Sequence, residues 1–126
     1  LAVIGHDPHS ADGNWYVYDY FETVYETDLL RYPSGDRVKA LMKQTGFQDV
    51  QQQNVEHVLN IHSGEDVLNE PFLKQSATSQ LALLDEVVYQ AGIEKIKADL
   101  KRAQGCGEQI VFKSDFWVRM FSGIKA

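Results

Sequence analysis

The stretch Ile-Val-Phe-Lys-Ser-Asp-Phe-Trp-Val-Arg-Met-Phe at residues 110–121 decides the fold expected for this chain. Read as an extended segment, it places apolar side chains on both faces. One face carries Ile110, Phe112, Phe116, Val118 and Met120, and the other carries Val111, Trp117 and Phe121. A strand that is apolar on both faces lies inside a sheet that is covered on both sides. The polar run at residues 113–115 interrupts the alternation and indicates a β-bulge.

A second strand is expected at residues 1–6. The run Leu-Ala-Val-Ile-Gly at residues 1–5 is short, apolar and rich in branched side chains, which is typical of a buried strand. It lacks the basic start and the long apolar stretch of a signal peptide. A buried strand needs neighbours, and the chain begins without methionine. We therefore expect this sequence to start in the middle of a domain.

Helices and a third strand are expected between these two strands. Aromatic residues recur at three- and four-residue steps over residues 15–32, which predicts one or two helices. Ser34 is a good N-cap and Gly46 a good C′ residue for a helix at about 35–45. An extended, partly alternating stretch at 47–61 predicts the third strand. After a loop at 62–76, a short helix is expected at 79–84 and a longer one at about 86–103. This order predicts a three-layer α/β domain.

The composition is that of an ordinary globular domain. The chain has 126 residues, of which 44% are hydrophobic and 24% charged, so one core is expected. The net charge of −6 argues against a nucleic-acid partner. No apolar stretch is long enough for a membrane span. Cys106 is the single cysteine and is interpreted as a loop thiol, which favours a reducing, cytoplasmic location.

Several segments, in order along the chain, resemble class I S-adenosylmethionine-dependent methyltransferases. Residues 1–9, Leu-Ala-Val-Ile-Gly-His-Asp-Pro-His, resemble the fifth sheet strand of that family and the loop after it. The runs Trp-Tyr-Val-Tyr-Asp-Tyr-Phe at 15–21 and Asp-Leu-Leu-Arg-Tyr-Pro-Ser at 28–34 resemble a helical insertion found in one bacterial branch. Residues 42–50, 78–84 and 111–121 resemble the following helix and sixth strand, a further segment of that branch, and the final strand.

The resemblance implies that residues 1–126 are the C-terminal portion of one Rossmann-like methyltransferase domain. Its sheet would contribute three strands here, with the last one central and antiparallel, and helical insertions at about 15–32 and about 62–104. The family binds S-adenosylmethionine through a glycine-rich loop after its first strand, and no Gly-x-Gly-x-Gly occurs in this chain. Gly-Cys-Gly at 105–107 follows a helix and is rejected as such a loop. We therefore expect a cofactor-binding N-terminal half to be missing and this fragment to be inactive alone.

Candidate site residues follow from where the first strand ends. In open α/β sheets, ligands bind beyond the carboxyl ends of the strands. His6 or His9 is therefore a candidate general base, and Asp7 could orient one of them. The alternative is a polar turn. Residues predicted to line a pocket for a small-molecule substrate, or else to pack in the core, are Trp15, Tyr16, Tyr20, Tyr25 and His57. No metal site is expected, because neither cysteines nor clustered carboxylates accompany His57 and His62.

Two other classes of function remain open. A sheet cut beside residues 1–5 exposes an apolar strand edge, which favours a non-catalytic interaction or dimerisation domain and a homodimer through that edge. A small-ligand-binding α+β domain with an aromatic pocket is the third reading. The sequence does not identify the methyl acceptor.

Overall fold

The computed structural model describes residues 1–10 and 13–125 of an α/β chain with an open four-stranded sheet. The chain divides into two compact units. The sheet unit comprises Leu1–Asn14, Thr27–Leu59 and Asp115–Ala126. The helical unit comprises Trp15–Glu26 and Asn60–Ser114. Among the helices that the structure describes, none combines the length and apolar character needed to span a membrane.

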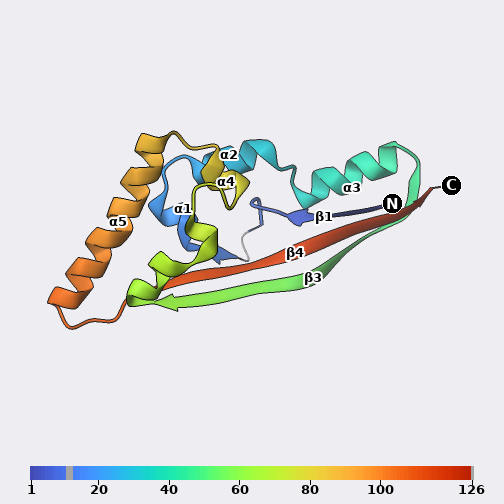
Figure 1. The fold of residues 1–126 in the computed structure, drawn as a ribbon. Coiled ribbons are helices and arrows are strands. Elements are labelled where there is room, and N and C mark those ends of the chain that lie inside the picture. The colour runs from blue at the N-terminus through green and yellow to red at the C-terminus, as the bar shows by residue number, and fades with distance from the viewer. Residues whose placement is uncertain (11–12, 126) are drawn as a thin grey trace. The chain divides into compact units, whose positions relative to one another are not determined.

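Strand β4 (Val111–Lys125) is the central strand of the sheet. It pairs with β1 (Ala2–His6), with β3 (Phe47–Ser63) and with the two-residue β2 (Asn14–Trp15). The pairing with β1 is antiparallel, and Figure 1 shows β4 running between β1 and β3. The expected central, antiparallel position of the last strand is confirmed. The expected count of three strands is wrong, because β2 is too short to carry an alternating pattern.

The covering of the sheet differs from the expectation. Helix α3 (Gly35–Gln44) buries Met42 and packs closely on β4, since a Cβ on Gly123 would lie 3.1 Å from the Met42 methyl carbon. On β3, however, Val55 and Leu59 are 46% and 49% exposed. The prediction that the strands are covered on both sides is therefore wrong for the residues described. Alternating apolar residues show which surface needs a cover, but not whether the same chain provides it.

The burial pattern of β4 changes after Ser114, close to residues 113–115, where the sequence predicts a bulge. Phe112 and Ser114 are buried on alternate positions, and the next buried positions are Arg119, Phe121 and Gly123. Arg119 is five positions after Ser114, so the buried positions change from even-numbered to odd-numbered between them. The boundary between the helical unit and the sheet unit, after Ser114, falls within this interval.

The aromatic-rich segment folds as two helices, α1 (Tyr16–Tyr20) and α2 (Val24–Arg31). Thr23 has a left-handed φ of 69° between them. Two 3₁₀ helices, η1 (Gly64–Asn69) and η2 (Pro71–Leu73), occupy the expected loop. They are followed by α4 (Ser79–Ala82) and α5 (Glu86–Gly105), after which Cys106 is exposed. The core of the helical unit contains Tyr16, Val17, Phe21, Val24, Val67, Leu73, Leu81, Ile96, Leu100 and Phe112.

Close packing of α5 on Phe21 explains Gly92. A Cβ added at Gly92 would lie 2.2 Å from Phe21 Cδ1 and 2.4 Å from Cε1. The Phe21 ring is buried and stacks on Tyr89 with 5.7 Å between ring centroids, so it has no free space to enter. Glycine is therefore required for space at this helix position, although it lowers helix propensity.

We predict that Gly92→Ala lowers the free energy of unfolding by about 1–2 kcal/mol, because the overpacking penalty exceeds the gain in helix propensity. Urea titration followed by circular dichroism measures this. The matched control is Gly105→Ala on the same helix, where nothing lies within 4 Å of the added Cβ. That control should leave stability unchanged or raise it by up to about 1 kcal/mol. A Gly92→Ala protein as stable as the control would contradict the packing argument.

Candidate functional site

The loop after β1 is fastened to helix α3 through Asp7. The Asp7 carboxylate accepts a hydrogen bond from the His9 backbone N–H at 2.9 Å through Oδ1 and one from the Gly35 N–H at 3.1 Å through Oδ2. Gly35 is the first residue of α3, so the negative charge also lies at the positive end of that helix. Asp7 therefore positions the loop by contacts to the backbone, whereas the sequence suggested that it orients a histidine ring.

Arg119 places a second charge beneath this loop. It projects from β4 and is only 6% exposed. Its Nη1 lies 3.9 Å from Asp7 Oδ2, and its Nη2 donates to Ser10 Oγ at 2.9 Å. A buried guanidinium is costly unless paired and hydrogen-bonded, and both conditions are met here. A signal for Arg119 is present in the sequence, since this cation stands between Val118 and Met120 in an apolar part of the strand.

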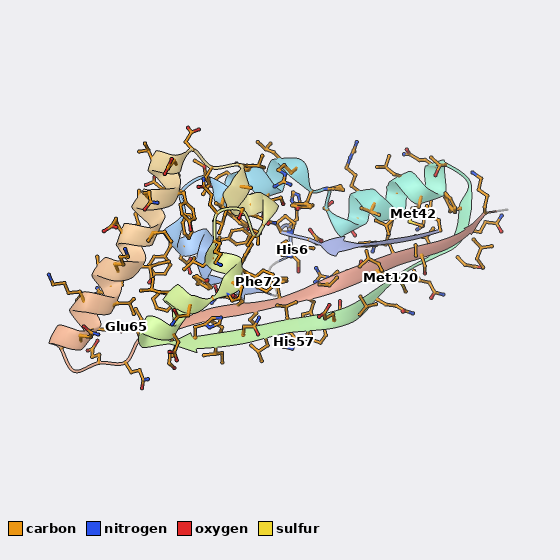
Figure 2. The ribbon with its side chains drawn as sticks, in the orientation of Figure 1. His6, Met42, His57, Glu65, Phe72 and Met120 are labelled. Atoms are coloured by element: carbon orange, nitrogen blue, oxygen red, sulfur yellow. The ribbon has the colours of Figure 1, made fainter. Side chains whose placement is uncertain are left out.

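His6 ends β1 (Figure 2), opposite Val118 on β4, and its ring lies near two aromatic rings. Its ring centroid lies 4.9 Å from that of Phe116 and 6.4 Å from that of Tyr32. Burial lowers the pKa of His6 below 6.5, and the carboxylate of fully buried Asp28 opposes that shift without reversing it. The imidazole is therefore neutral at pH 7, which is the form that accepts a proton.

His9 is held differently from His6. Its ring Nε2 lies 2.8 Å from the carbonyl oxygen of Tyr32 in an exposed position. Because a carbonyl only accepts hydrogen bonds, Nε2 must carry the proton in this contact. His9 therefore links the loop to the residue that follows α2, while His6 is the histidine enclosed by aromatic rings.

The predicted pocket aromatics belong mainly to the interior of the helical unit. The Tyr16 hydroxyl bonds the carboxylate of Glu70, and the Tyr20 hydroxyl donates to Asp99 Oδ2 at 2.6 Å. Burial and these carboxylates raise the pKa of both phenols. Trp15 and Tyr25 each pack edge-on against Tyr18, and Tyr25 is 40% exposed.

Glu70 and His62 form a buried polar group that the sequence did not indicate. Glu70 is 8% exposed, and its Oε1 lies 3.3 Å from His62 Nε2. The sequence around Glu70 does not predict that it is buried and hydrogen-bonded, because its partner Tyr16 lies in α1, 54 residues earlier in the chain.

The remaining candidate, His57, is in the sheet unit and lies on the exposed part of β3. Its ring stacks on Trp117 with 4.3 Å between centroids, and its Nε2 lies 2.6 Å from Asp115 Oδ1. His57 is thus partnered across to β4 without being a core residue. Within residues 1–10 and 13–125, no group of three or more His, Cys, Asp or Glu side chains is placed to hold a metal ion.

Comparisons with protein-family models, with curated proteins and with solved structures found no match for this chain. The arrangement at the end of β1 must therefore be interpreted from its own chemistry. It offers one neutral, partly enclosed imidazole on a loop that is fixed by Asp7 and Arg119.

The lowered pKa of His6 predicts how stability depends on pH. The folded state binds fewer protons than the unfolded state between the folded pKa and 6.5, so the free energy of unfolding should rise with pH across that window and level off above it. Unfolding titrations between pH 5 and about 8 measure this slope. His6→Gln should flatten it. An NMR titration that placed the pKa of His6 above 6.5 would contradict the assignment.

Replacing Asp7 tests its role as an anchor of the loop. Asp7→Ala removes two backbone hydrogen bonds and a carboxylate 3.9 Å from Arg119, so we expect a loss of about 2–3 kcal/mol in the free energy of unfolding. Asp7→Asn keeps an acceptor oxygen and should lose less. Chemical denaturation measures both. Equal, negligible losses would show that these contacts do not hold the loop.

Proposed function

We propose that this chain is the C-terminal, substrate-side part of a class I S-adenosylmethionine-dependent methyltransferase. The observation that supports this most is the strand arrangement, with the last strand, β4, antiparallel between β1 and β3. That arrangement is the one implied by the resemblance of residues 1–9 and 111–121 to the family. A second support is that the segment resembling the family's strand ends at His6, next to the fixed loop.

In this proposal His6 is the residue that accepts a proton. S-adenosylmethionine supplies the methyl group when bound. An acceptor hydroxyl or amine that gains the methyl group must lose a proton, and the neutral His6 imidazole can take it. Phe116 and Tyr32 keep water from part of that ring, and Asp7 and Arg119 fix the backbone on which it stands. In this proposal His6 transfers a proton, and the residues around it only hold it in position.

The cofactor itself has no fitting residues in this chain. The sequence contains no Gly-x-Gly-x-Gly, whose backbone amides could approach the cofactor closely. Strand β1 pairs with β4 alone among the described strands. The side chains of Ile4 in this strand and of Leu1 just before it are each 64% exposed. We propose that a further segment carrying the glycine-rich loop pairs along this open edge of β1.

Calorimetry with S-adenosylmethionine tests this proposal. This chain alone should give no heat of binding, whereas the product of a gene that extends upstream of Leu1 should bind saturably. That upstream frame should encode a strand, a Gly-x-Gly loop and a helix. Replacing the first glycine of that loop with valine provides the matched control and should abolish the heat. Saturable binding by this chain alone, or an upstream frame without such a unit, would refute the assignment.

The open edge also supports a second candidate, a homodimer that pairs β1 with its copy. Sedimentation velocity over a range of concentrations would then show a dimer. Ile4→Lys should dissociate it, because a charge on an edge strand opposes pairing. The matched control is Ile124→Lys on β4, since Ile124 is 65% exposed and Ile4 64%. A wild-type chain that stays monomeric at every concentration excludes this candidate.

A further inference from the structure

A cavity of about 520 Å³ lies in the helical unit. Its apolar lining comes from Leu68, Leu73 and Ile93, and Tyr89 adds an aromatic wall. The volume is within the range of small-molecule sites. Polar and charged side chains complete the lining, namely Asn69, Glu70, Lys74, Gln90 and Lys97. These residues come from the 3₁₀ segment and from α5, both in the helical unit.

The aromatic wall of this cavity is fixed in place. The Tyr89 hydroxyl donates to the Leu73 carbonyl oxygen at 2.7 Å, which joins α5 to the 3₁₀ segment. The Tyr89 ring stacks on Phe21 at an interplanar angle of 22°. A pocket whose wall is held by packing and by a hydrogen bond loses little entropy when a ligand enters.

The charged side chains that line the cavity differ in whether each already has a bonding partner. Lys74 lines the cavity, and its ammonium has no ion-pair partner among the residues that the structure describes. Lys97 also lines it and lies 3.8 Å from Glu94, an exposed pair of small energetic value. Glu70 is the acidic residue of the lining, and its carboxylate is already bonded to Tyr16 and lies close to His62.

We propose that this cavity binds a small monoanionic amphipathic acid, with one carboxylate or sulfonate on an apolar body. Lys74 and Lys97 attract the anionic group, and the apolar lining accepts the body. The carboxylate of Glu70, which is already hydrogen-bonded to Tyr16, would repel a second negative charge on the ligand. This proposal rests on the cavity alone and does not depend on methyl transfer by the parent protein.

Two fluorescent probes of nearly the same shape test the proposal. 8-Anilinonaphthalene-1-sulfonate carries one negative charge, and N-phenyl-1-naphthylamine is its neutral counterpart. The whole chain should bind the sulfonate saturably and more tightly than the neutral probe. The double variant Lys74→Met with Lys97→Met should weaken sulfonate binding roughly fivefold, as expected for two exposed charge contacts. Its binding of the neutral probe should not change.

The control variant removes the same number of lysine charges, both from α5, at positions that do not line the cavity. Lys95→Met with Lys101→Met should leave the affinity for the sulfonate within about twofold of the wild type. Gln90→Trp, at an exposed position of the lining, should block both probes by filling the cavity. Equal weakening in the two double variants, or binding that survives both Gln90→Trp and loss of the lining lysines, would overturn the proposal. The first outcome would indicate only net charge, and the second a site elsewhere.

Discussion

The antiparallel pairing of β4 with β1 and β3 is the constraint on which the other features depend. Because the strand alternates its side chains, β4 directs Phe112 into the core of the helical unit and Arg119 toward the loop after β1. Its buried positions are even-numbered up to Ser114, in the helical unit, and odd-numbered from Arg119 onward, in the sheet unit. One strand therefore supplies both the apolar contact of one unit and the buried charge of the other.

His6, Glu70 and Asp7 differ in what surrounds each polar group. His6 is enclosed by aromatic rings and kept neutral, so it remains available to accept a proton. Glu70 is enclosed together with its hydrogen-bond partner, the neutral Tyr16 hydroxyl, so one of its oxygens is already occupied before any ligand arrives. Asp7 belongs to a third case, since its oxygens are occupied by backbone donors and leave the loop rigid. Whether each group can accept a proton or bind a ligand therefore depends on the contacts that it already makes.

Sequence patterns could predict the parts of this fold that depend on local periodicity. The central position of residues 110–121, the helix capped by Ser34 and the long helix after Asp85 all follow from such patterns and are confirmed. β2 was missed because two residues carry no period. Glu70 was missed because its partner Tyr16 is distant in sequence. The exposure of Val55 was missed because apolar alternation does not identify the covering segment.

The register of β1 has a consequence for how this chain can change in evolution. Leu1 and Gly123 exchange two backbone hydrogen bonds at 3.1 Å, and His6 lies opposite Val118 at the other end of the strand. Deleting one residue within β1 would turn every later side chain of the strand to the opposite face and remove His6 from its aromatic neighbours. Deleting two would restore the facing. Variation in the length of this strand is therefore tolerated only in even steps if the histidine is to keep its surroundings.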